Sequence, residues 1–126
     1  MITKREVALK YIELLEKGNI KDLLKLFSNK SIVESPIYGV LNATQFYNEL
    51  RNDTQKSEIA IKGIFEENNS DKLALYFNYR WTLKNNDLVT FDVVDIMEFN
   101  NANQISKIKI IYDTVKSREI VNILRK

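Results

Sequence analysis

The sequence predicts an α+β fold in which a curved sheet of long antiparallel strands wraps over helices. Apolar residues recur at helical spacing in the N-terminal part of the chain, whereas from residue 57 onward they alternate with period two. One proline and three glycines leave little room for a linker. Residues 1–126 are therefore expected to form a single domain with the helices first and a strand meander after them.

Three helices are expected before the meander. Thr3 and Glu6 form a capping box for the first helix, which ends at Gly18. A short second helix starts near Ile20, and Asn42 caps the third. The apolar faces of these helices comprise Val7, Ala8, Tyr11, Ile12, Leu14, Leu15, Leu23, Leu24, Leu26, Phe27, Phe46, Tyr47 and Leu50.

Between the second and third helices, residues 31–35 form a short extended segment that Pro36 ends. The residue before a proline is disfavoured in the helical region, so Ser35 is an extended residue at a bend that continues through Tyr38 and Gly39. The meander then comprises residues 57–67, 72–84 and a long hairpin over 88–113 that turns at 100–103, with a last helical segment possible after Asp113.

Asp95 is the residue that does not fit this apolar pattern. Strand side chains alternate between faces, so Asp95 lies in a row with Val89, Phe91, Val93, Met97 and Phe99. A carboxylate in such a row must be paired, protonated or directed into a cavity, because burying an unpaired charge is very unfavourable.

Composition excludes several kinds of site. The chain has no cysteine and no histidine, which removes disulfides, thiolate metal sites and the commonest general base. The net charge of +2, spread along the chain, gives no sign of nucleic-acid binding. No segment has the length or apolarity of a membrane span or a signal peptide. We therefore expect a cytoplasmic protein with no metal, no cofactor and neither nucleic acid nor membrane as a partner.

The segments KYIELLEKGNIKDLLKLFSNKSIVESPIYG, TQFYNEL and DIMEFNNANQISKIKIIYD, taken in order, resemble the nuclear transport factor 2-like (NTF2-like) superfamily. More narrowly, they resemble its SnoaL-like and ketosteroid-isomerase-like proteins. The resemblance implies a conical barrel of a bent antiparallel sheet, with the three N-terminal helices closing an apolar pocket. It also implies a homodimer formed through the outer sheet face. The superfamily includes isomerases, cyclases, epoxide hydrolases, dehydratases, binding proteins and interaction modules, so the fold does not determine the activity.

The isomerase branch implies specific roles for three residues. Tyr11 and Asp95 fall on the tyrosine and the aspartic acid of the isomerase oxyanion hole, a site in which an apolar environment keeps a carboxylic acid neutral. The isomerase general base is an aspartate at the position of Ser35, and a serine without a neighbouring base cannot abstract a carbon-bound proton at neutral pH. Glu34 is adjacent, but strand alternation turns it to the opposite face. A standard ketosteroid isomerase is therefore not expected.

A two-residue turn at Asn85 and Asn86 would pair Tyr76 with Asp95, and would place Asn78 and Arg80 on the same face. These three polar side chains would then join Asp95 in the pocket, as in the superfamily's epoxide hydrolases, although the local arrangement of arginine and aspartate in those enzymes is absent. A shift of one residue in register would instead expose Arg80. The same turn places Phe77, Tyr79 and Trp81 on the outer face, as candidates for the dimer interface.

The resemblance also implies an apolar pocket lining. The lining residues are Phe46, Phe91, Val93, Met97, Ile108, Ile110 and Tyr112.

Each candidate also has a purely structural interpretation. Asp95 could be a structural acid bonded to Tyr11 or Tyr76 or paired with Arg80, Tyr11 a core aromatic residue, and Ser35 a turn residue. The leading hypothesis is a pocket that binds a small hydrophobic molecule bearing a carbonyl or hydroxyl group, with or without isomerase-, cyclase- or hydratase-type turnover. The alternative is a non-catalytic dimeric scaffold or interaction module whose pocket is filled by aromatic side chains.

Overall fold

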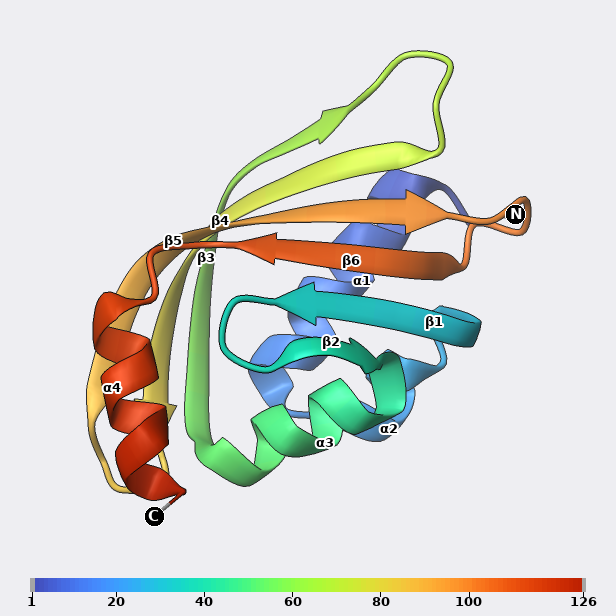
Figure 1. Ribbon diagram of the computed structural model, residues 1–126. Coiled ribbons are helices and arrows are strands. Elements are labelled where there is room, and N and C mark those ends of the chain that lie inside the picture. Colours follow the sequence, from blue (N-terminus) through green and yellow to red (C-terminus); the bar gives the residue numbers. More distant parts are fainter. Residues whose placement is uncertain (1, 126) are drawn as a thin grey trace.

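Residues 2–125 are described by the structure, a computed structural model in which helices come first and a curved sheet follows (Figure 1). The described elements are α1 (Lys4–Lys17), α2 (Ile20–Leu24), β1 (Phe27–Ser35), β2 (Gly39–Asn42), α3 (Ala43–Asp53), β3 (Thr54–Glu66), β4 (Lys72–Leu83), β5 (Leu88–Phe99), β6 (Ile105–Ile111) and α4 (Val115–Leu124). The predicted α+β class is confirmed. None of the helices within residues 2–125 is long and apolar enough to span a bilayer.

The predicted helix ends are confirmed by their capping contacts. The Thr3 hydroxyl accepts a bond from the Glu6 backbone N–H, and the Glu6 carboxylate accepts one from the Thr3 backbone N–H. Gly18 adopts a left-handed conformation with φ of 72°, which a residue without a side chain adopts at little cost. The Asn42 side chain accepts a bond of 2.8 Å from the backbone N–H of Gln45 at the start of α3.

The sheet is mixed rather than wholly antiparallel, with strand order β2-β1-β6-β5-β4-β3. The predicted meander is present, because β3, β4, β5 and β6 pair in succession as antiparallel neighbours. The expectation of an entirely antiparallel sheet was wrong at one pairing, since β1 runs parallel to β6. That pairing joins strands far apart in the sequence, and local patterns carry no signal for it.

The sheet bends strongly along β3, β4 and β5, and α4 lies beside the bent end of these strands (Figure 1). Helices α1 and α3 pack against the concave side. Alternate residues of the central strands form the inner row, which is buried except for the half-buried Phe91. The row comprises Leu73, Leu75, Phe77, Tyr79, Trp81 and Leu83 of β4 and Val89, Phe91, Val93, Asp95, Met97 and Phe99 of β5. The row predicted for β5 is therefore confirmed, with Asp95 in it.

The predicted pairing of β4 with β5 was wrong by one residue. The Leu83 backbone N–H donates to the Asp87 carbonyl, so the loop has three residues, 84–86, instead of two. Asn86 is left-handed in this loop, with φ of 72°, as three-residue hairpin loops require at that point. Leu75, not Tyr76, consequently faces Asp95, and every β4 side chain lies on the face opposite to the predicted one.

Candidate functional site

A small cavity lies between the helices and the concave face of the sheet, with a volume of about 50 Å³. It is bounded by α1, α3, the three central strands and the turn after β1. The residues that line it are Tyr11, Leu15, Ser35, Tyr38, Phe46, Leu50, Phe77, Tyr79, Trp81, Phe91, Val93, Asp95, Ile110 and Tyr112. Within this described set there is no lysine or arginine, so every polar group at the cavity is a hydroxyl, an indole N–H or the Asp95 carboxyl.

Asp95 is the only carboxyl group in that lining, and it is almost completely buried, with 1% of its surface exposed. Its Oδ1 has no hydrogen-bond partner among the described residues. The sequence suggested Tyr11, Tyr76 or Arg80 as the partner of Asp95, but none of them bonds to it. The Tyr11 hydroxyl bonds to another tyrosine, and Tyr76 and Arg80 lie on the other face of the sheet. Asp95 is therefore not a structural acid fixed by a neighbouring side chain.

Burial raises the pKa of Asp95 from 3.8 to about 8, because the apolar surroundings disfavour the charged form. At neutral pH the group is then mainly a neutral carboxylic acid. A neutral carboxylic acid has one O–H to donate and one carbonyl oxygen to accept with. The Asp95 side chain is thus able both to give and to take a hydrogen bond at the cavity.

Two hydroxyl pairs lie near Asp95. The hydroxyls of Tyr11 in α1 and Tyr47 in α3 are 2.6 Å apart, and those of Tyr79 and Ser57 are 2.7 Å apart. Burial raises the pKa of Tyr11 and Tyr47 well above the usual value, and that of Tyr79 to about 12, with the nearby Asp95 charge a further cause in each case. These phenols are therefore uncharged hydrogen-bonding groups, and in each pair one hydroxyl proton remains for another acceptor.

Ser35 lies at the cavity and also shapes the turn that follows β1. Its Oγ accepts a bond of 3.0 Å from the Tyr38 backbone N–H, which is the contact expected of a turn residue. The neighbouring Glu34 lies on the opposite face of the strand, where it is 3.7 Å from Lys109. The site therefore has no second carboxyl group beside Asp95 to serve as a base.

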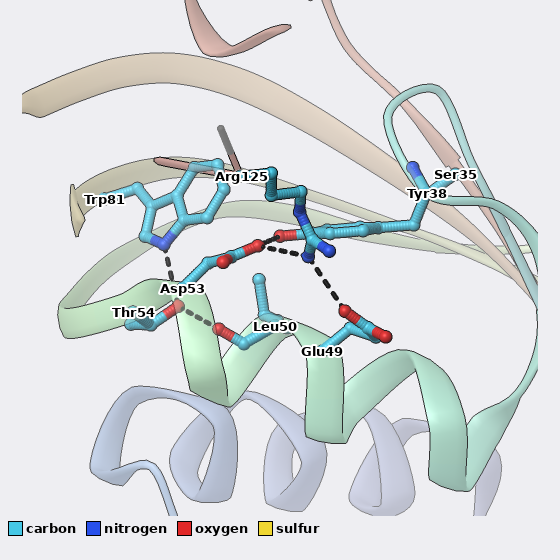
Figure 2. Close-up of polar contacts among 8 residues, drawn as sticks. All are labelled: Ser35, Tyr38, Glu49, Leu50, Asp53, Thr54, Trp81 and Arg125. Atoms are coloured by element: carbon cyan, nitrogen blue, oxygen red, sulfur yellow. Dashed lines mark hydrogen bonds and ion pairs between the residues drawn. The ribbon is translucent and has the colours of Figure 1, made fainter. Parts of the chain in front are cut away.

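A polar network holds the wall of the cavity near its surface end (Figure 2). The Tyr38 hydroxyl donates to Asp53 Oδ2 at 2.5 Å, and Arg125 Nη2 donates to the same oxygen at 2.7 Å and to Glu49 at 2.8 Å. The Arg125 guanidinium also lies 5.3 Å from the centre of the Tyr38 ring. Two carboxylates thus bind the single positive charge of Arg125 just outside the cavity.

Trp81 is fixed to the same end of α3 (Figure 2). Its indole Nε1 donates to Thr54 Oγ1 at 2.8 Å, and that hydroxyl donates to the Leu50 carbonyl at 2.6 Å. The indole N–H is therefore already satisfied, and Trp81 contributes an apolar wall.

The structure gathers many of the predicted site residues at this cavity, but their roles stay predictions. Those at the cavity are Tyr11, Ser35, Phe46, Phe91, Val93, Asp95, Ile110 and Tyr112. Met97 and Ile108 are fully buried in the core away from the cavity lining.

Tyr76, Asn78 and Arg80 were wrongly placed in the pocket, because the three-residue loop turns them to the outer face. There the Tyr76 ring lies under Lys62, Asn78 donates to Asp92, and Arg80 lies 3.8 Å from Glu58.

The aromatic residues expected on the outer face, namely Phe77, Tyr79 and Trp81, line the cavity instead. These aromatic residues alternate with Tyr76, Asn78 and Arg80 along β4, so the sequence shows that they share one face of the strand. It does not show whether that face points toward the helices or outward.

Other residues of the site carried no signal in the sequence. Tyr38 lies in a short turn, and Asp53 and Arg125 are separated by 72 residues. The contact between Asp53 and Arg125 requires the end of α4 to lie next to α3, and no local sequence pattern predicts that arrangement. Among residues 2–125, no cluster of acidic side chains is arranged to hold a metal ion.

No family model matches the sequence, and no curated protein sequence matches it. Solved structures do match over most of the chain. An NTF2-like protein of unknown function from Burkholderia pseudomallei K96243 has a TM-score of 0.81 at 13% identity, covering 94% of this chain and 97% of that chain.

Two further matches are named for an activity or a ligand. The epoxide hydrolase/cyclase-like enzyme SalBIII, of pyran ring formation in the polyether salinomycin, has a TM-score of 0.77 at 13% identity, covering 87% of this chain and 90% of that chain. TerC, co-crystallised with polyporic acid, has a TM-score of 0.78 at 15% identity, covering 94% of this chain and 98% of that chain. At these identities the likeness extends to the fold alone.

Proposed function

Because this chain has the fold of the NTF2-like superfamily, we propose that it binds a small, uncharged, hydrophobic molecule at the Asp95 cavity. The ligand presents a carbonyl or hydroxyl oxygen to the protonated Asp95. The observation that carries this proposal is that Asp95 lines a cavity and that its buried Oδ1 has no hydrogen-bond partner within residues 2–125. A buried polar atom without a partner is unfavourable by about 1–3 kcal/mol, and a bound oxygen removes that penalty.

The charge of the surroundings supports an uncharged ligand. The cavity lining has no cationic side chain, and the nearby Arg125 is already bonded to Glu49 and Asp53. An anionic ligand would lose its water without gaining a counter-charge. Aromatic rings form much of the wall, and they favour a ligand with a flat apolar body.

The chemistry available to a bound ligand is limited by the absence of a base. Asp95 can donate to an oxygen that gains negative charge, and the Tyr11–Tyr47 pair can add a second donor. Ser35 cannot remove a proton from carbon. Any turnover would therefore depend on stabilising charge on oxygen, as in isomerisation, cyclisation or hydration.

Ligand screening by thermal shift tests the proposal. The probes are small cyclic ketones and phenols, followed by steroids and polyketide-like ketones. Stabilisation by a probe should disappear in Asp95→Ala and persist in Asp92→Ala, since Asp92 is an exposed carboxylate paired with Lys62 on the outer face. It should also weaken above about pH 8, where Asp95 ionises. Equal responses of the two variants would show that Asp95 is not the polar contact.

The second candidate function is a non-catalytic dimeric scaffold. The small size of the cavity favours it, because about 50 Å³ is below the roughly 150 Å³ of a cavity that holds benzene. The outer sheet face also carries an apolar patch that a second copy could cover, made of Phe65, Ala74, Tyr76, Val94, Ile96 and Ile111. A scaffold of this kind would dimerise and would respond to none of the probes.

A further inference from the structure

We propose that the turn 36–38 is a lid for the Asp95 cavity, and that Arg118 and Arg125 of the C-terminal segment hold this turn closed. This inference concerns how a ligand reaches the cavity, and its biological role rests on the proposed function. The lid itself is a property of the unliganded chain, so it is testable without any ligand.

The need for an opening follows from the volume of the cavity. A cavity of about 50 Å³ accommodates a few water molecules. Its volume is about a third of the roughly 150 Å³ of a cavity that binds benzene in a protein interior. An organic ligand therefore enters only if part of the wall moves.

The side chains with partial exposure show which part of the wall is nearest to solvent. Tyr38, Leu50, Phe91, Ile110 and Tyr112 line the cavity and are half-buried, whereas Asp95 and Tyr11 are almost fully buried. Tyr38 belongs to a turn between two strands, and the rest of this group belongs to helix or sheet or follows the sheet directly. The Tyr38 turn is thus the part of the wall that can move without breaking the sheet.

Both arginines of the C-terminal segment contact that turn. Arg118 Nη2 donates to the Pro36 carbonyl at 2.5 Å, and the Arg125 guanidinium covers the Tyr38 ring (Figure 2). Arg125 further bonds to Asp53, the same carboxylate that accepts from the Tyr38 hydroxyl. Release of Arg125 would leave the Tyr38 side chain held by Asp53 alone.

The rest of α4 is weakly attached. Its buried residues are Ser117, Ile120 and Val121, and the buried Ser117 hydroxyl has no partner in the part of the chain that the structure describes. Val115 and Ile123 are 79% and 56% exposed. A short helix with few buried side chains opens at lower free energy than the sheet beneath it. The polar contacts of the two arginines are therefore a large part of what keeps α4 in place.

Thiol accessibility tests the lid, because the chain has no cysteine of its own. In Val93→Cys the introduced thiol lies at the cavity, and its reaction rate with methyl methanethiosulfonate reports how often the cavity opens. Adding Arg125→Met should raise this rate by about tenfold or more, since a charge-assisted hydrogen bond is removed from the closed state. Adding Arg80→Met, which removes an exposed arginine on the outer face, should leave the rate unchanged.

A second thiol separates lid opening from general unfolding. In Leu73→Cys the thiol lies in the core and outside the cavity lining, so Arg125→Met should not change its rate. Arg118→Met should act on the cavity thiol in the same direction as Arg125→Met. An unchanged cavity rate in both arginine variants, or an equal rise at both thiols, would overturn the lid. A failure of all probes to bind would overturn the proposed function and leave the thiol result standing.

Discussion

At the scale of single residues, Asp95 is the feature that the sequence disclosed most directly. Its position on the inner row follows from counting along one strand, so it does not depend on how β5 pairs with β4. The partners of Asp95 could not be read in the same way, because Tyr76 and Arg80 were assigned through a pairing. No side chain among the described residues 2–125 bonds to this acid, and this isolation makes it a candidate ligand contact.

Asp95 should make stability depend on pH in a characteristic direction. Its pKa is about 8 in the folded chain against 3.8 unperturbed, so between these values the folded state holds more protons than the unfolded state. Its contribution to stability is full below pH 3.8 and is lost as the pH rises through about 8. The free energy of unfolding, measured with urea, should therefore fall relative to Asp95→Asn by up to about 1.4 kcal/mol per pH unit between about pH 5 and pH 8.

Asp92→Asn is the matched control for this titration. The hydrogen bond from Lys62 lowers the pKa of Asp92, so its contribution to stability changes only in more acidic solution. Parallel pH profiles of the unmodified chain and Asp95→Asn would contradict the raised pKa of Asp95.

At the scale of elements, local sequence patterns predicted most ends of the helices and strands but did not predict how the strands pair. The capping box at Thr3, the left-handed Gly18 and the Asn42 cap depend on neighbouring residues only. The register of β4 depends on whether the loop after it has two or three residues, and its Asn-rich sequence suits both lengths. Because the loop is one residue longer than predicted, Tyr76, Asn78 and Arg80 lie on the outer face of the sheet and the aromatic residues of β4 lie on the inner face.

The loop after β4 can be tested through Asn86. With φ of 72°, Asn86→Val should destabilise the chain by about 1–2 kcal/mol in urea unfolding, because a β-branched side chain is strained in that region. Asn86→Gly should match or slightly exceed the unmodified stability. Asn101→Val, in the next hairpin turn but without a positive φ, should have little effect. A large loss at Asn101 and none at Asn86 would contradict the assigned loop.

At the scale of the whole molecule, the resemblance in sequence and the match in structure agree on the fold. Neither the resemblance nor the structural match establishes an activity, since structures of this fold include an epoxide hydrolase/cyclase-like enzyme and proteins of unknown function. The parallel contact of β1 with β6 and the return of α4 to α3 join distant segments. These long-range contacts shape the cavity and its surface end, which is why sequence patterns located Asp95 but not the site around it.

The outer sheet face gives a prediction for assembly. Val94 lies between Tyr76 and Ile111 at the centre of the apolar patch, so a second copy that covers the patch would bury it. Sedimentation velocity should show a dimer for the unmodified chain and a monomer for Val94→Lys. Val40→Lys, which changes an exposed valine on the edge strand β2, should remain dimeric. A monomeric unmodified chain would remove the scaffold hypothesis in its dimeric form.

The most direct test of the central claim is a ¹³C NMR titration of the Asp95 carboxyl carbon, assigned by comparison with Asp95→Asn. A neutral acid buried at the cavity predicts a midpoint near pH 8. A midpoint near the ordinary value of 3.8 would mean that the carboxyl group is solvated or paired, and it would contradict the proposed ligand site.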